Sequence, residues 1–432
     1  MSTFDQVLPT VREVLNEHIH QLAKLGSVII NRDLNGRIRL VLSNTLPDNA
    51  ETKSAIATLV QALSSRLGLH CFPPENMVLF EPSFEAVLQN APRYILEDLP
   101  DVTVVDRLAT ETDWSNISPA STLGPRIVFF SIKGGVGRST ALAVAAWSLA
   151  QAGKRVMVLD LDLESPGLSS SLLPGEIRPA YGITDWLVED LLDNTASIFE
   201  DMVAISNLSH DGEILVVPAH GNNPGEYVAK LGRVWMPKVK EDGSYERWSC
   251  RLNRLLDQLQ ERWQPNVIMI DCRAGIDEVA SACITDLGAK SILLFALDSE
   301  QTWEGYRILF QHWRRTGVVL DIRERLQFVG AMIPEIEGLN YRDELCEHAW
   351  NLFTEEIYDE IPAGENTGDR FSYDKHDEYA PHYPWAIKWH RGFAAVRSIH
   401  SRVQHIDLNE VNTIFGPLVH GLQTISETEE PS

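Results

Sequence analysis

The sequence predicts an α/β protein with a doubly wound, mostly parallel sheet, preceded by a small α+β domain. An apolar run at 127–131 leads through a glycine-rich turn into an alanine-rich helical stretch at 141–150. A second apolar run, at 155–160, follows after a short turn and completes a strand–helix–strand unit. More apolar runs alternate with helical patterns, as buried parallel strands do, at 267–270, 292–297 and 326–333.

The turn after the first strand predicts a phosphate-binding loop. Glycines let backbone N–H groups converge on an anion, and the following helix adds its partial positive charge. The usual P-loop is G-x-x-x-x-G-K-[ST], and here Ile132 replaces the first glycine and Arg138 replaces the lysine. A glycine turn that binds nothing is the alternative, which two further nucleotide motifs disfavour. The expected nucleotide-binding residues are Gly134, Gly135, Val136, Gly137, Arg138, Ser139 and Thr140.

Together with Lys133, this loop resembles the deviant Walker A motif K-G-G-x-G-K-[ST] of the MinD/ParA group of P-loop ATPases, within the SIMIBI class. It matches at every position except Arg138, which is typical of the group's KGGVGR-motif variants. The resemblance implies that ATP and Mg²⁺ are the ligands. It also implies a catalytic role for Lys133, which would reach across a nucleotide-bridged homodimer to the partner's phosphates.

The second strand ends in Asp160, and Asp162 lies two residues further on. In the resembled family a D-x-D at this place forms a switch. The resemblance implies that Asp162 positions the attacking water and that Asp160 supports the magnesium shell. Phosphoryl transfer depends chiefly on positioning and electrostatics, so a carboxylate need not be a strong base for this role. A pair of solvated loop acids is the alternative interpretation.

The third strand ends in Asp271 and resembles a Walker B strand, with Arg273 where the family has proline. The resemblance implies that Asp271 holds Mg²⁺ through a water while the Ser139 hydroxyl is a direct ligand, in keeping with the preference of Mg²⁺ for oxygen. Arg273 could be a second cation for the γ-phosphate, or it could pair with Asp277 or Glu278. Both possibilities stay open.

Two departures from the family pattern limit the prediction. Arginine presents a bulkier, planar fork than lysine, so we expect Arg138 to bind phosphate and to support only slow hydrolysis, with a turnover below about 10 s⁻¹. The family commonly places an adenine-contacting asparagine near 332–334, where this chain has Met-Ile-Pro. ATP is therefore expected from the family, and no residue supports base specificity.

Composition restricts the class of protein. The hydrophobic fraction of 44% is ordinary, and no apolar run reaches the roughly 18 residues that a membrane span needs. The N-terminus lacks the basic and apolar regions of a signal peptide. The five cysteines are scattered without a CxxC pair, which favours a cytoplasmic location and disfavours a structural zinc site.

The net charge of −24 disfavours a DNA-partitioning role, because nonspecific DNA affinity comes from neutralising phosphates. Arg247, Arg251 and Arg254 recur at helical spacing, and we interpret them as a solvated helix face, with a local basic patch as the alternative. The segment 407–425 has apolar residues at helical spacing without Lys or Arg, so we expect a helix packed on the sheet and no membrane anchor.

We expect four regions: a partner-binding or regulatory α+β domain at 1–118, a linker at 119–125, the ATPase domain at 126–425 and an acidic tail at 426–432. The predicted elements of the first region are helices at 4–25 and 52–67 and paired strands at 27–31 and 37–43. The segment 174–265 exceeds a minimal crossover, and its predicted elements are helices at 182–192 and 246–263, a strand at 213–218 and a surface loop at 227–245. The aromatic-rich segment 381–391 is either core or a partner contact.

These observations predict an ATP-binding, slowly hydrolysing molecular switch that dimerises on nucleotide and regulates a partner protein. The partner would bind through 1–118 or 174–265. A nucleotide-sensing scaffold with little hydrolysis, controlling an effector in bacterial defence or signalling, is the alternative. A DNA-partitioning ATPase is disfavoured by charge.

Overall fold

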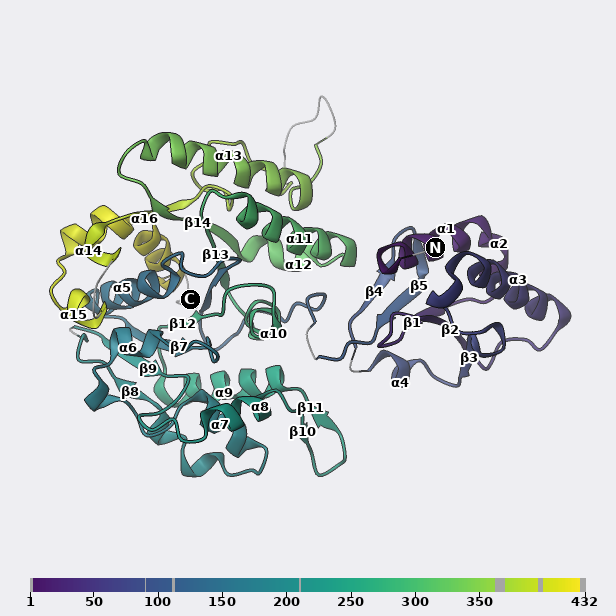
Figure 1. Cartoon of the computed structure of the whole chain (residues 1–432), viewed down its shortest axis with the longest axis horizontal. Helices are drawn as coiled ribbons and strands as arrows, with labels where there is room; N and C mark the ends of the chain where they lie inside the picture. The colour runs from purple at the N-terminus through teal and green to yellow at the C-terminus, as the bar shows by residue number, and fades with distance from the viewer. Residues whose placement is uncertain are drawn as a thin grey trace. The chain divides into compact units, whose positions relative to one another are not determined.

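An eight-stranded sheet is the central feature of the computed structural model (Figure 1). Its order is β15-β14-β13-β6-β12-β7-β9-β8, and only the edge strand β8 runs antiparallel to its neighbour. The predicted doubly wound, mostly parallel fold is therefore confirmed. The strands are β6 Arg126–Ser131, β7 Arg155–Asp160, β8 Ala204–Ile205, β9 Glu213–Val217, β12 Val267–Asp271, β13 Ser291–Ala296, β14 Leu326–Ile333 and β15 Trp385–Lys388.

The structure describes residues 3–89, 91–110, 113–209, 211–361, 370–394 and 399–427. The chain divides into two compact units. The smaller consists of Met1–Asn116 with His312–Val318, and the larger of Ile117–Gln311 with Val319–Ser432. The acidic tail predicted at 426–432 lies almost wholly outside the described residues.

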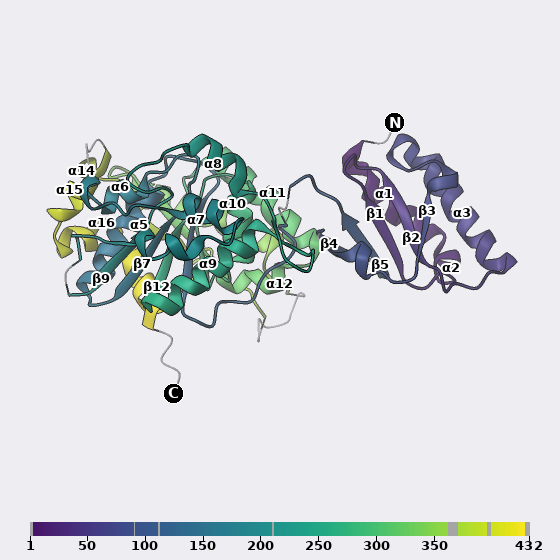
Figure 2. The same cartoon turned by 90° about the horizontal axis from the view of Figure 1, so that it is seen from below.

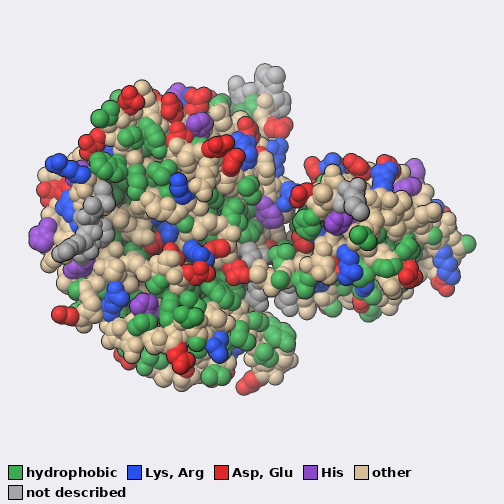
Figure 3. Space-filling model, in the orientation of Figure 1, with side chains coloured by type: hydrophobic (Ala, Val, Ile, Leu, Met, Phe, Trp, Pro, Cys, Tyr) green, Lys and Arg blue, Asp and Glu red, His purple; other side chains and the backbone are tan. Residues whose placement is uncertain are grey.

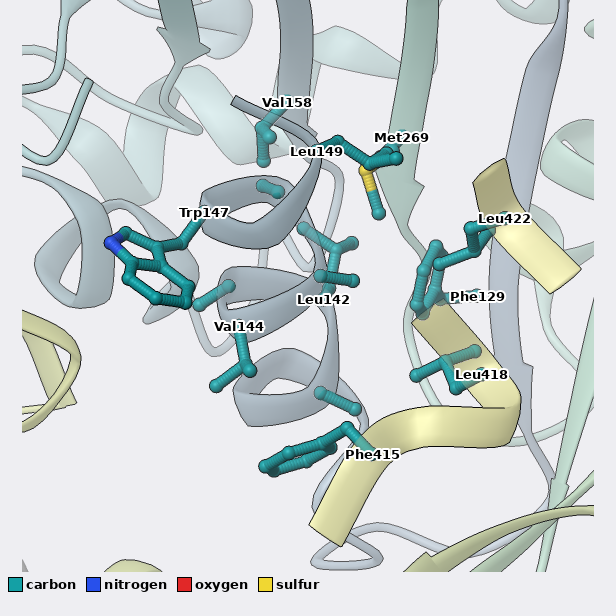
Figure 4. Packing of buried hydrophobic residues seen from close by; sticks show 14 of the residues in the cluster. Phe129, Leu142, Val144, Trp147, Leu149, Val158, Met269, Phe415, Leu418 and Leu422 are labelled. Atoms are coloured by element: carbon teal, nitrogen blue, oxygen red, sulfur yellow. The ribbon is translucent and has the colours of Figure 1, made fainter. Parts of the chain in front are cut away.

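Successive side chains of a strand point to opposite faces of a sheet. The central strands are apolar at nearly every position, so both faces of the large sheet are apolar, and helices cover both. Phe129 of β6 lies in a core cluster with α5 (Arg138–Gln151) and α16 (Leu408–Glu427), as Figure 4 shows. The next residue, Phe130, meets Tyr306 of α11 (Glu300–Thr316) with the ring centroids 6.1 Å apart. The helix predicted at 407–425 is thus present and packs on the sheet.

Small side chains bring α5 close to the strands. Its alanines at 141, 143, 145, 146 and 150 are at most 1% exposed. Alanine is also the best helix former and loses no side-chain entropy on burial. The helix that carries the glycine-rich loop is therefore fixed rigidly against the sheet, and its N-terminus has a defined position.

The arginines of α9 (Trp248–Trp263) do not form the solvated face that the spacing predicted. Arg251 is fully buried, and its Nε donates to Asp190 at 2.7 Å. Arg254 donates to the same carboxylate at 3.0 Å, and Arg247 pairs with Asp286 at 3.0 Å. The prediction was wrong because two buried carboxylates on other elements, Asp190 and Asp286, attract these cations inward. Helical spacing alone does not reveal such partners.

The segment 174–265 is more ordered than predicted. The helices expected at 182–192 and 246–263 and the strand expected at 213–218 are present as α7 (Ile183–Asp190), α9 and β9. The expected surface loop instead holds α8 (Tyr227–Val234) and a hairpin of β10 (Lys238–Val239) and β11 (Tyr245–Glu246). The remaining helices of this unit are α6 Leu168–Leu172, α10 Glu278–Ser281, α12 Val319–Ile322, α13 Gly338–Glu356, α14 Arg391–Ala394 and α15 Ile399–Gln404.

The smaller unit has a mixed sheet of order β3-β2-β1-β5-β4. Helices α1 and α3 bury one face of it (Figure 2). The predicted strand pair is present as antiparallel β1 and β2, whereas the predicted first helix is interrupted at His18, whose ψ is 33°. The elements are α1 Val7–Glu17, α2 Ile19–Leu22, α3 Ala50–Leu67, α4 Glu85–Leu88, β1 Val28–Arg32, β2 Ile38–Ser43, β3 Val78–Glu81, β4 Arg93–Leu96 and β5 Leu99–Asp106.

Charge distribution and helix hydropathy bear on function. Acidic and basic side chains are interspersed over the face of the larger unit in Figure 3. Within the described ranges, no helix is both long and apolar enough to cross a membrane.

Candidate nucleotide-binding site

The glycine-rich loop joins the end of β6 to the start of α5. Gly135 and Gly137 have φ of 76° and 80°, a left-handed conformation that glycine adopts without the cost of a side chain. A Cβ added at Gly134 or Gly135 would meet no atom within 4 Å, so the space above the loop is open. The backbone geometry explains glycine at 135 and 137, whereas at 134 a Cβ would meet no atom of the protein.

Strand register brings the predicted acidic residues together. In the parallel sheet, Asp271 at the end of β12 is paired with Asp160 at the end of β7 and with Phe129 near the end of β6. The carboxyl ends of these three strands meet at one edge, next to the N-terminus of α5. Residues far apart in sequence therefore lie together at this edge of the sheet.

Arg138 is bound to the strand ends. Its Nε donates to Oδ1 of Asp271 at 2.7 Å, and its Nη1 donates to Oγ of Ser131 at 2.9 Å. The Ser139 hydroxyl donates to the other oxygen of Asp271 at 2.5 Å. Arg138 is 7% exposed and Asp271 is 1% exposed. A buried cation therefore pairs with one oxygen of Asp271, and the Ser139 hydroxyl binds the other.

Burial changes the acidity of both strand-end aspartates. Complete burial, with help from the charges of Asp271 and Asp162, raises the pKa of Asp160 to about 7. Oδ2 of Asp160 accepts from the backbone N–H groups of Gly167 and Ser169 at 3.2 and 3.4 Å, which opposes the rise. Burial also raises the pKa of Asp271, and Arg138 opposes that rise. Oδ1 of Asp160 has no hydrogen-bond partner in the described part of the chain.

The donor set fits a magnesium ion. Ser139, Asp160 and Asp271 supply only oxygen ligands, which Mg²⁺ prefers, and the unpaired Oδ1 of Asp160 is a buried acceptor at the same edge. Among the described residues no three His, Cys, Asp or Glu side chains form a metal-binding group. A site with one or two protein carboxylates completed by water and phosphate is the usual arrangement for Mg²⁺.

The other predicted site residues, Asp162, Lys133 and Arg273, take no part in the buried Arg138–Asp271 pair. Asp162 is partly exposed, and its Oδ1 accepts from the N–H of Ser165 at 3.1 Å. Lys133 is exposed and has no ion-pair partner among the described residues. Arg273 pairs with Glu164 at 2.7 Å and with Asp277 at 3.2 Å, so of its two interpretations the structure favours the ion pair.

A cleft continues from the loop toward the ends of β14 and β15. It begins as a small pocket of about 90 Å³ between Gly137 and Trp389, and a larger one of about 710 Å³ shares its wall at 388–390. Trp389 is 40% exposed there. Met332 has φ of 52°, rare for a residue with a side chain, and its Cε lies 3.5 Å from where a Cβ on Gly137 would be.

Two further residues lie in this region without having been predicted there, Ser131 and Trp389. Ser131 carried a signal, since it is the only polar residue in the apolar run 127–131. Trp389 lies in the aromatic-rich segment that was assigned either to core or to a partner contact. That segment is partly core, because His382 is fully buried. Nothing in the sequence revealed the backbone conformation of Met332.

Comparisons with known proteins agree with the geometry. A family profile described as the CobQ/CobB/MinD/ParA nucleotide binding domain matches residues 127–369. No curated protein sequence matches the chain.

Similar solved structures include two MinD proteins and a ParA family ATPase. MinD in the MinC:MinD cell division protein complex of Aquifex aeolicus has 16% identity and a TM-score of 0.40, covering 72% of this chain and 99% of that one. A ParA family ATPase from Chlorobium tepidum TLS has 16% identity and a TM-score of 0.37, covering 52% and 80%. The cell division ATPase MinD of Pyrococcus furiosus has 22% identity and a TM-score of 0.33, covering 49% and 73%. With values this low, the family assignment rests on the profile match.

Proposed function

Because the chain belongs to the CobQ/CobB/MinD/ParA nucleotide-binding domain family, we propose that it is an ATP-binding, slowly hydrolysing molecular switch. Nucleotide closes a homodimer, hydrolysis opens it, and a partner protein responds to the difference. The observation that carries the proposal is the open glycine cradle at the N-terminus of α5, directly above a buried Arg138–Asp271 pair.

Each residue has a role in this proposal. Backbone N–H groups of the loop and the N-terminus of α5 bind the phosphates. Ser139, Asp160 and Asp271 would hold magnesium, which when bound stabilises negative charge on the phosphate oxygens. Asp162 orients the attacking water, and Lys133, exposed and unpaired within the described residues, is available to a second subunit.

Arg138 provides the physical reason for slow hydrolysis. Its guanidinium binds Asp271 and Ser131. It must leave this buried pair before it can contact phosphate, and Asp271 then becomes available to the magnesium shell. A phosphate offers the guanidinium a bidentate partner in exchange, so the movement is feasible. It adds a step that the compact ammonium group of a lysine would make more easily.

The alternative is a nucleotide-sensing scaffold with little hydrolysis. The closed Arg138–Asp271–Ser139 cluster favours it, since both oxygens of Asp271 are engaged. In either case a protein partner would bind through 1–118 or 174–265. A DNA-partitioning role remains disfavoured, because the net charge is −24 and the charges in Figure 3 are interspersed.

Steady-state ATP turnover and equilibrium ATP binding test the proposal on the wild type, Lys133→Ala, Asp162→Ala and the exposed-lysine control Lys240→Ala. We expect wild type and control to turn over below about 10 s⁻¹ and Asp162→Ala to bind ATP without turnover. Binding without any turnover by the wild type would support the scaffold. Absence of ATP binding would refute both.

A further inference from the structure

Tyr227 connects the segment 174–265 to the loop that carries Asp162. It is the first residue of α8, and its hydroxyl donates to the carbonyl oxygen of Leu163 at 2.7 Å. Its ring meets His220 edge-on, with centroids 5.2 Å apart and an interplanar angle of 71°. Leu163 directly follows Asp162, so this hydrogen bond fixes the backbone beside the carboxylate proposed to orient water.

Helix α8 is itself held in place. Nζ of Lys230 binds Oδ1 of Asp185 at 2.5 Å, and Oδ2 of Asp185 accepts from the N–H of Gly182 at 2.8 Å. Gly182 is the N-cap of α7, so α8 is tied to the start of another helix. The position of Tyr227 is therefore determined by two helices of the segment 174–265 and not by the nucleotide-binding motifs.

The loop after Asp160 has several other tethers. Gly167 and Ser169 donate to Asp160, and Ser165 donates to Asp162, all from within the loop and its own strand end. From outside the loop, the carbonyl oxygen of Asp271 accepts from the Leu161 N–H at 3.0 Å, and Arg273 pairs with Glu164 at 2.7 Å. Tyr227 supplies a further tether from a separate element, at the residue next to Asp162. Burial raises the pKa of Tyr227 above its usual value, so its hydroxyl keeps its proton and remains a donor at neutral pH.

We propose that Tyr227 is a positioning residue for Asp162: its hydrogen bond to Leu163 sets the orientation of the loop from which Asp162 acts on the attacking water. The inference rests on the proposed function. It assigns part of the catalytic geometry to α8, an element outside the glycine-rich loop and the strand-end aspartates. Tyr227 does not contact the reacting atoms in this role.

The matched pair of variants is Tyr227→Phe, which removes only the hydroxyl, and Tyr245→Phe, which removes an exposed hydroxyl in β11. The first readout is amide hydrogen exchange over 161–169 in the nucleotide-free protein. We expect exchange about fivefold faster in Tyr227→Phe, as loss of one ordinary hydrogen bond implies, and no change in Tyr245→Phe. Equal exchange in both variants would overturn the inference.

The second readout separates positioning from binding. In Tyr227→Phe we expect kcat for ATP to fall about fivefold while the ATP dissociation constant stays unchanged. An unchanged kcat, or a weakening of ATP binding that accounts for the whole loss, would also overturn it. If the wild type itself shows no turnover, the hydrolytic part of the proposed function fails, and the role of Tyr227 fails with it. Normal wild-type turnover together with normal Tyr227→Phe turnover contradicts only the inference.

Discussion

Replacing Arg138 with methionine is expected to destabilise the protein, because it leaves Asp271 as a buried carboxylate without a cation. Asp271 is 1% exposed and receives 2.7 and 2.5 Å hydrogen bonds from Arg138 and Ser139. Removing one partner of a buried ion pair costs about 3–5 kcal/mol. The isolated carboxyl can instead take up a proton, which at pH 7 costs about 4 kcal/mol relative to the ordinary aspartate pKa near 3.9. The expected loss at pH 7 is therefore at most about 4 kcal/mol.

The loss should depend on pH in a defined direction. Without Arg138, burial raises the pKa of Asp271 further above its unfolded value, so the folded state binds more protons and stability falls as pH rises. At pH 5, protonating the carboxyl costs only about 1.5 kcal/mol. The upper limit on the destabilisation of Arg138→Met thus falls from about 4 to about 1.5 kcal/mol between pH 7 and pH 5, and the measured loss should shrink with it.

Urea unfolding in EDTA measures this effect on the wild type, Arg138→Met, Asp271→Asn and the double variant. We expect the double variant to be much closer to the wild type than the two single losses combined would place it, because it contains neither unpaired charge. An Arg138→Met protein within about 0.5 kcal/mol of the wild type, or an equal loss at both pH values, would refute the reasoning.

Three further predictions concern the loop, the cleft and a buried histidine. Gly137→Ala should lower the free energy of unfolding by about 1–2 kcal/mol because φ at this position is 80°. Gly134→Ala should weaken ATP binding without changing the melting temperature. Equal melting temperatures for the two variants would contradict this. Trp389→Ala should weaken ATP binding about tenfold if the base stacks on the indole, as measured by calorimetry, while the 96%-exposed control Tyr379→Ala should not. Burial lowers the pKa of His382, so wild-type stability should fall as pH drops below about 6.5 more steeply than that of His382→Asn; parallel curves from urea unfolding would rule this out.

The parts of the fold and site that could be predicted have local sequence signals. Buried parallel strands are short apolar runs, and the φ values of Gly135 and Gly137 require glycine. The ends of parallel strands meet at one edge, so Asp160 and Asp271 could be placed together before their register was known. The roles assigned to individual residues at this edge stay predictions.

The parts that could not be predicted depend on distant partners. The direction of the Arg138 side chain is set by Ser131 and Asp271, whereas the sequence alone predicted phosphate as its partner. Helix α8 begins in a stretch of mixed composition and is held by the Lys230–Asp185 pair, a contact between residues 45 positions apart. Tertiary contacts of this kind override local propensity.

The central claim is that nucleotide controls assembly, and the molar mass of Asp162→Ala measured by light scattering after size exclusion tests it most directly. With ATP and Mg²⁺, the account predicts a stable species of twice the 48.5 kDa chain mass, and a single-chain mass without nucleotide. The additional substitution Lys133→Ala should keep the protein monomeric even with ATP. An assembly state that is the same with and without ATP, in a protein shown to bind ATP, would contradict the switch.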